Sequence, residues 1–186
     1  MIMVAPATND PTSEPPGRAL AGRAADQPKW LWADGLAGIT LAGYAVPVAL
    51  VPHTTRFSDI ERNPDNERTA GVFAFRVEAS LLYFNVDHVL REVLKRIDAQ
   101  QDVRLVVCDL STSPYVDLAG ARMLTRLSTE LAARGIALRL AETRATVRDI
   151  LRAEGLDAVA GPISRRTSVA DAIEVFQRTD TTREGA

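Results

Sequence analysis

The chain has 186 residues, of which 46% are hydrophobic and 25% are charged, as in a soluble globular protein that builds a core without disulfides or metals. Its formal net charge of −2 gives no basic surface, so nucleic acid is not an expected partner. One cysteine, Cys108, excludes an intramolecular disulfide, and with two histidines the chain offers no ligand set for a dedicated zinc site. We expect neither a metal nor a cofactor.

The first part of the chain has three stretches of different composition. Residues 1–29 are rich in proline, alanine, glycine and threonine, and we expect them to be a disordered tail. Residues 30–52 are a hydrophobic segment, and its uncharged part from Gly35 to Pro52 has 18 residues, the lower limit for a membrane span. Its glycines and prolines weaken it as a straight helix. Residues 53–70 are polar and are expected to be a linker.

Regular patterns begin at residue 71. The β-rich runs 72–77 and 81–84 are separated by three residues and predict a hairpin. Apolar residues at positions 86, 89, 90, 93, 94 and 97 then predict a helix with one apolar face. The continuous apolar run 103–110 is typical of a strand that is buried on both faces.

The second half alternates helices and strands. After a polar loop at 111–115, Asp117 is placed as the N-cap of a helix that ends at Gly135. A strand at 136–140 follows, then a helix around 147–151 and a last helix after Ser168, with a short strand near 158–160 as a further candidate. This order predicts an α/β domain at 71–178, in which helices pack against a mixed sheet of about four strands, and a disordered tail at 179–186.

Several segments in the right order resemble a STAS domain, the family named after sulfate transporters and anti-sigma-factor antagonists. The most specific is VRLVVCDLSTSPYVDLAGARML at 103–124, and the resemblance extends over residues 53–178. The segments GVFAFRVEASLLYFN, RFSDIERNPDNE and RAEGL are similar to the transporter branch. Upstream, DGLAGITLAGYAVPVAL at 34–50 resembles the opening of the first membrane helix of SulP transporters. A remnant of a deleted transporter gene is one hypothesis for this combination.

The resemblance implies a regulatory, protein-binding module of a SulP-type sulfate transporter, located in the cytoplasm at the inner face of the membrane. Its implied partner is a transporter membrane domain or another protein, and a homodimer is one implied state. We expect no stable membrane span and no transport by the chain alone, because transport sites form between several membrane helices. The alternatives are an anti-sigma-factor-antagonist-like switch and a sulfate transporter fragment. No catalytic motif is present in the sequence, so we do not expect an enzyme.

The candidate site is the loop and helix start around Asp117. Small residues after Asp117 would leave the backbone N–H groups of the first helical turn exposed, where they could bind an anion or a nucleotide. The alternative is that Asp117 is an ordinary helix cap with no ligand. In the antagonist branch a hydroxyl residue of this turn is phosphorylated, but the matching residue here is Ala119, which has no hydroxyl. The loop hydroxyls are candidates for modification or are simply solvated, and Tyr115 either contacts a partner or packs under the loop. The candidate residues are Ser111, Thr112, Ser113, Pro114, Tyr115, Asp117, Leu118, Ala119 and Gly120.

Two further residues have structural expectations. Asp109 ends the buried strand and is expected to accept hydrogen bonds from loop amides rather than to catalyse a reaction. Cys108 has apolar neighbours, and we expect a buried, unreactive thiol.

Overall fold

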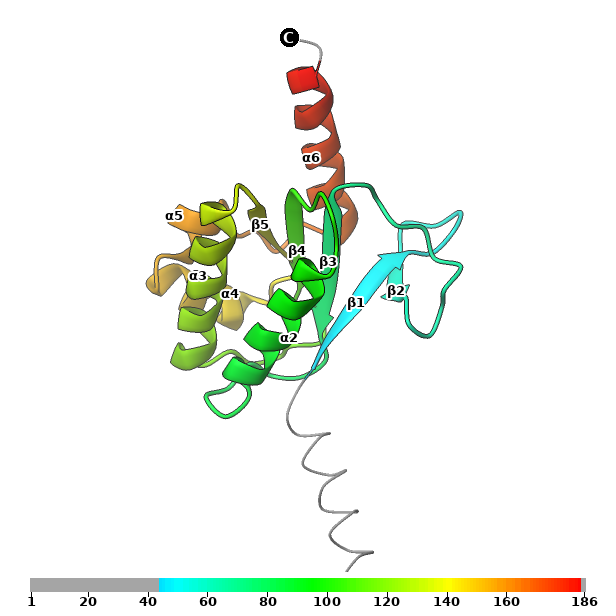
Figure 1. Cartoon of the computed structure of the whole chain (residues 1–186). Helices are drawn as coiled ribbons and strands as arrows, with labels where there is room; N and C mark the ends of the chain where they lie inside the picture. The colour runs from blue at the N-terminus through cyan, green and yellow to red at the C-terminus, as the bar shows by residue number, and fades with distance from the viewer. Residues whose placement is uncertain (1–43, 185–186) are drawn as a thin grey trace, which may run out of the picture. The chain divides into compact units, whose positions relative to one another are not determined.

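The computed structural model of the chain describes residues 44–184, and in this part five strands form one mixed sheet in the order β2-β1-β3-β4-β5 (Figure 1). Strands β3, β4 and β5 are parallel, and β1 is antiparallel to both β2 and β3. The expected mixed α/β fold is confirmed, with one strand more than the four anticipated. The strands are β1 (Ala45–Leu50), β2 (Phe57–Asp59), β3 (Val72–Val77), β4 (Leu105–Asp109) and β5 (Ala137–Ala141).

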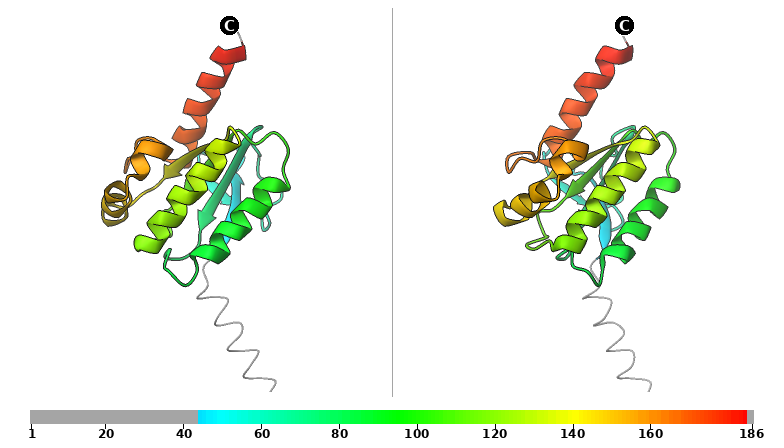
Figure 2. Two further views of the ribbon diagram at one scale, coloured as in Figure 1. Left: turned by 60° about the vertical axis from the view of Figure 1, so that its left-hand side comes forward. Right: turned by 90° about the vertical axis from the view of Figure 1, so that its left-hand side faces the viewer.

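Helices cover both faces of this sheet. Helices α2 and α3 lie side by side on one face (Figure 2), and the larger apolar core lies between them and the sheet. Helix α6 packs on the opposite face, against β4 and β5, through Val169, Ala172 and Ile173. The helices are α2 (Val86–Asp98), α3 (Leu118–Ala133), α4 (Ala145–Ala153), α5 (Leu156–Ala160) and α6 (Val169–Glu184).

Strand β4 is the centre of the fold, as its continuous apolar sequence predicted. All five of its residues are buried, because α2 and α3 cover one face and α6 the other. Its neighbours are in parallel register, so Cys108 lies between Phe75 of β3 and Leu140 of β5. The loops that follow β3, β4 and β5 therefore all leave from one edge, which we call the carboxyl edge.

The predicted hairpin between residues 72–77 and 81–84 is wrong. Leu81 forms one isolated parallel bridge with Val116, and the chain then turns into α2. The reason is that β3 already has partners on both sides: antiparallel β1 on one and parallel β4 on the other. No side of β3 is left for a strand that follows it directly.

The sheet also takes in residues that were expected to lie outside the domain. Residues 45–50, the last part of the stretch that resembles a SulP membrane helix, form β1, and β2 lies within the expected linker. Residues 158–160 belong to helix α5 rather than to a strand, and α6 extends to residue 184, into the expected tail. The predicted disordered tail at 1–29 and the start of the hydrophobic segment lie outside the described residues. Among residues 44–184, no helix combines the length and the apolar character that crossing a membrane requires.

Candidate functional site

Asp117 joins two loops at the carboxyl edge. It has extended backbone angles and is the N-cap of α3, as predicted, because its Oδ1 accepts a hydrogen bond from the Gly120 amide at 2.8 Å. Its Oδ2 accepts a second bond from the Tyr83 amide, also at 2.8 Å. One carboxylate therefore fixes the start of α3 and the loop between β3 and α2 at the same time.

Gly120 is needed at this position because the β3–α2 loop approaches α3 closely. The Leu81 amide donates to the Tyr115 carbonyl and the Leu81 carbonyl accepts from the Asp117 amide, both at 3.0 Å. A Cβ added to Gly120 would lie only 2.6 Å from that Leu81 carbonyl oxygen. The small residue thus makes room for protein backbone, and its own amide is already bonded to Asp117. An anion or nucleotide at this helix start stays a prediction.

Two of the loop hydroxyls hold the β4–α3 loop against the end of β3. Ser113 is fully buried, and its hydroxyl donates to the Ala79 carbonyl oxygen at 2.5 Å. The Thr112 hydroxyl donates to the Val77 carbonyl oxygen at 2.7 Å. Ala119 lies in the first turn of α3 and supplies no hydroxyl there. The hydroxyls of residues 112 and 113 therefore have structural partners and are not simply solvated.

An ion pair between a buried carboxylate and a partly buried arginine lies behind this loop and was not foreseen from the sequence. Asp109 accepts a hydrogen bond from the Ser111 amide at 2.9 Å, as expected of a strand-end carboxylate. Its other oxygen accepts from Arg76 Nε at 2.7 Å, and Arg76 also donates to the Phe57 carbonyl at 3.0 Å. Arg76 is the single charged residue of β3, and that was the available signal.

The Cys108 thiol beside this pair is fully buried. Burial raises the pKa of Cys108 well above its usual value, and the neighbouring Asp109 carboxylate raises it further. The thiol therefore stays protonated at neutral pH, which agrees with the expected lack of reactivity.

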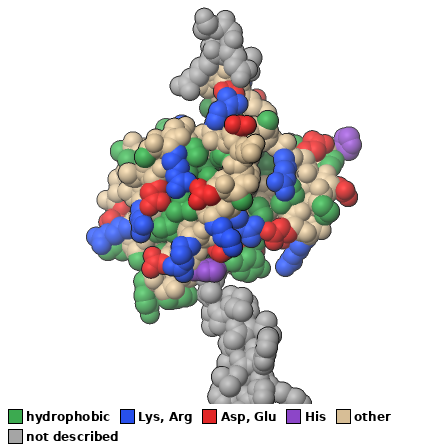
Figure 3. All heavy atoms as spheres, viewed as in Figure 1, with side chains coloured by type: hydrophobic (Ala, Val, Ile, Leu, Met, Phe, Trp, Pro, Cys, Tyr) green, Lys and Arg blue, Asp and Glu red, His purple; other side chains and the backbone are tan. Residues whose placement is uncertain are grey.

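Four exposed residues at the carboxyl edge form what we call the apolar patch: Tyr83 (76% exposed), Phe84 (54%), Tyr115 (68%) and Leu118 (47%). The rings of Tyr83 and Phe84 meet edge to face, with their centres 5.5 Å apart. Hydrophobic side chains protrude at the lower edge of the molecule in Figure 3, where the β3–α2 and β4–α3 loops lie in Figure 1. Tyr115 is exposed, so it does not pack under the loop. Sequence reasoning selected Tyr115 and Leu118 but missed Tyr83 and Phe84, which it placed in the predicted strand 81–84.

The described part of the chain begins at this same edge. Strand β1 is antiparallel to β3, so its first residue lies next to the end of β3. The Tyr44 carbonyl accepts a hydrogen bond from the Glu78 amide at 3.0 Å, at the start of the β3–α2 loop. Tyr44 therefore lies on the side of the domain that carries the apolar patch.

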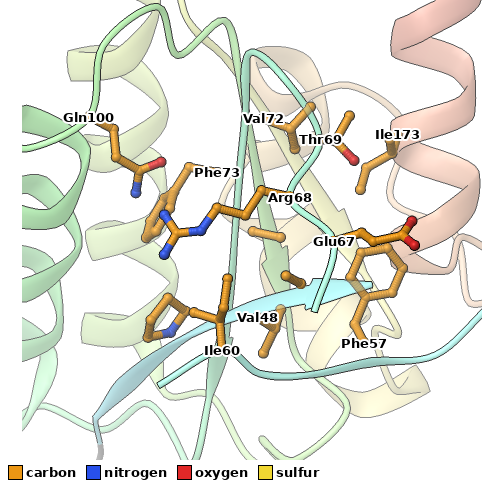
Figure 4. A pocket seen from close by; sticks show the side chains of 13 residues that line it. Val48, Phe57, Ile60, Glu67, Arg68, Thr69, Val72, Phe73, Gln100 and Ile173 are labelled. Carbon is orange, nitrogen blue, oxygen red and sulfur yellow. The ribbon is translucent and has the colours of Figure 1, made fainter. Parts of the chain in front are cut away.

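A separate pocket lies between β1, the segment 57–69 and α6 (Figure 4). Val48, Phe57 and Ile173 line one side of it, and the Arg68 side chain lies near Phe73 and Gln100 on the other. Its cavity volume of about 30 Å³ has room for water but not for a metabolite. Among the described residues no group of three or more potential metal ligands comes together. The apolar patch is therefore the more informative surface.

These features define an α/β domain whose distinctive surface is a pair of tied loops at the carboxyl edge. The STAS domain family model matches residues 63–172, more than half of the chain, and the chain belongs to this family. The resemblance to a STAS domain is thereby confirmed.

Relatives with curated names are transporters of much greater length. The chain is 28% identical over 132 residues to a probable sulfate transporter of Mycobacterium tuberculosis, a match that covers 70% of this chain and 24% of the relative. It is 28% identical over 142 residues to sulfate transporter 2.2 of Arabidopsis thaliana, covering 69% and 21%. The solved murine Slc26a9 anion transporter in its inward-facing state shares the fold, with a TM-score of 0.66 and 20% identity over 80% of this chain and 24% of that one. The chain spans about a quarter of the length of these relatives.

Proposed function

We propose that this chain is a regulatory, protein-binding STAS domain that acts on the membrane domain of a SulP-type anion transporter from the cytoplasm. In this role it neither catalyses a reaction nor moves ions by itself. The observation that carries the proposal is the apolar patch, because four exposed apolar residues gather at the carboxyl edge of the sheet. The names of the transporter relatives supply the class of partner.

The patch has the properties of a protein-binding surface. Aromatic residues are enriched at the centres of interfaces, and a contiguous exposed apolar patch commonly marks an interaction site. The loops that carry it are held by the Asp117 carboxylate and by the backbone bonds of Leu81. A patch that is already ordered loses less conformational entropy on binding, and this favours affinity.

The switch function of the antagonist branch is less well supported. Ala119 has no hydroxyl to phosphorylate, and Ser113 is buried with its hydroxyl bonded to backbone carbonyls. A second copy of this chain is the competing partner for the apolar patch. Sedimentation of the chain alone over a range of concentrations measures whether it forms a homodimer, and so separates this case from binding to a membrane domain.

The test measures binding of the full chain to the detergent-solubilised membrane domain of the Mycobacterium tuberculosis relative. The variant Phe84→Ser/Tyr115→Ser removes two aromatic groups of the patch, and we expect at least a tenfold loss of affinity. The matched control is Ile150→Ser/Val159→Ser, which removes two exposed apolar groups on α4 and α5. Equal affinity of the patch variant and the wild type, or no binding by the wild type, would show that the proposal is wrong.

A further inference from the structure

The apolar patch continues into a groove between α2 and α3. We call it the α2–α3 groove. Tyr83 and Leu118 of the patch line one end, and the first turns of the two helices form its walls. Its floor is apolar and is made by the inner faces of these helices, through Val86, Leu90, Ala119 and Met123. At the far end the helices are bridged by an ion pair between Asp98 and Arg134, with 2.6 Å between Oδ1 and Nη1.

The α3 rim of this groove carries two arginines one turn apart. Arg122 and Arg126 have side chains 69% and 65% exposed. Each binds a carboxylate of this chain through Nε only: Glu154 at 3.4 Å and Glu130 at 2.9 Å. Such exposed pairs contribute little to stability. Within residues 44–184 the terminal nitrogens of both guanidinium groups have no hydrogen-bond partner, so each arginine can bind a second carboxylate.

We propose that the α2–α3 groove binds an amphipathic helix of a partner protein, with acidic residues one turn apart that face Arg122 and Arg126. This inference rests on the proposed function and specifies the chemistry of the partner at that site. An apolar floor between two helices suits a helix that presents apolar residues at positions i, i+3 or i+4, and i+7. Positions 118 to 126 of α3 span roughly 12 Å at 1.5 Å per residue, so a helix of two to three turns fills the groove.

The acidic side chains around the groove favour a protein helix over an anionic membrane. Asp87 stands on the α2 rim, and Glu130 and Glu154 lie beside the two arginines. A flat surface of negative headgroups would be repelled by these carboxylates, because like charges brought together without a counter-charge are unfavourable. A partner helix, in contrast, has its charges at defined positions. Its carboxylates can pair with the two arginines of α3, while the position that faces Asp87 is uncharged or carries a basic residue.

The probe is a fluorescein-labelled 15-residue peptide of high helix propensity, with leucines on one face and two glutamates one turn apart beside them. A comparison peptide has glutamine in place of both glutamates. Fluorescence anisotropy measures binding to the full chain, to Arg122→Glu/Arg126→Glu and to the control Arg165→Glu/Arg166→Glu. The control makes the same change in charge on the loop before α6, where neither side chain binds a carboxylate in the described structure. Thermal melting by circular dichroism verifies that each variant is folded.

We expect saturable binding of the acidic peptide by the wild type and the control, and at least tenfold weaker binding both by Arg122→Glu/Arg126→Glu and with the glutamine peptide. Binding that is equal in the folded Arg122→Glu/Arg126→Glu variant, or absent in the wild type up to millimolar peptide, overturns the inference. The inference is also overturned if the peptide does not bind and the chain instead sediments with vesicles of anionic phospholipid in a way that depends on Arg122 and Arg126. If the peptide binds as expected but the transporter membrane domain does not, the proposed function fails and the groove inference stands.

Discussion

The substitution Gly120→Ala tests how the two loops of the site are joined. At an ordinary helical position this change stabilises a protein by about 1 kcal/mol, because alanine loses less backbone entropy. Here the new Cβ would lie 2.6 Å from the Leu81 carbonyl oxygen and 2.9 Å from Val116 Cγ1. Backbone atoms have no rotamer to change, so α3 must move away from the β3–α2 loop and stretch the bonds of Asp117. Overpacking costs about 1–3 kcal/mol and a weakened cap about 1 kcal/mol, so we expect a net loss of about 1–3 kcal/mol.

The assay is urea unfolding of the full chain, monitored by circular dichroism. The dependence of the unfolding free energy on urea is compared between variant and wild type, because equal slopes exclude a change in the compactness of the unfolded state. The control is Ala119→Gly in the same helical turn, where the ordinary rule predicts a loss below about 1 kcal/mol. The reasoning therefore predicts that alanine is the better residue at position 119 and glycine at position 120. An increase in stability for Gly120→Ala would refute the close approach of Leu81 on which the description of the site depends.

Three further outcomes follow from buried or capped groups. Asp109→Asn leaves Arg76 without its carboxylate, and we expect about 2–4 kcal/mol less stability in urea unfolding; a change within about 0.5 kcal/mol would contradict a structural role of the pair. The Cys108 thiol has a raised pKa and is buried, so an aromatic disulfide reagent should label it only as the chain unfolds, and rapid labelling of the folded chain would be inconsistent with its burial. Hydrogen bonds from the Ser168 amide and hydroxyl lower the pKa of Asp171 in the folded chain from its ordinary value of 3.8. The Asp171 carboxylate therefore stabilises the fold above pH 3.8, and this stabilisation is lost as the pH falls through the lowered pKa of the folded chain. Asp171→Asn should therefore melt below the wild type at neutral pH, and the difference should shrink as the pH falls below 3.8; a difference that does not shrink on acidification would disprove this linkage.

Much of the fold was accessible from the sequence because its central elements have strong periodic patterns. The run 103–110 and the one-faced helix after residue 85 correspond to β4 and α2. Strand β1 was missed because its six residues, AVPVAL, are mostly buried and have no polar alternation, so composition alone does not separate them from a membrane segment. Pro47 lies inside this strand although proline lacks the backbone donor of a sheet ladder. It is accommodated because the ladder with β2 ends at Val48: beyond it the Pro47 carbonyl still accepts a hydrogen bond from the Ile60 amide at 3.1 Å, but no further ladder bond needs a donor at position 47.

The geometry of the candidate site could be predicted from the sequence only where it depends on neighbouring residues. Asp117 was identified as a cap because a cap depends on a few adjacent residues, and this role is confirmed. Tyr83 and Phe84 were missed because the run 81–84 has strand-like composition, and only the occupied sides of β3 prevent it from pairing. The bond between Arg76 and Asp109 joins residues 33 positions apart, and it depends on how β3 and β4 are aligned.

The Arg76–Asp109 pair also bears on the register between β3 and β4. Apart from Arg76 and Asp109, strands β3 and β4 are apolar on both faces, so sliding one past the other by two residues keeps every side chain on its own face and leaves the apolar pattern intact. In the observed register Arg76 lies directly opposite Asp109. After such a slide it would lie opposite Val107, a fully buried position with no counter-charge. We therefore expect the pair to penalise misaligned sheets, and replacing both residues with apolar ones should keep the chain compact while allowing more than one strand alignment during refolding.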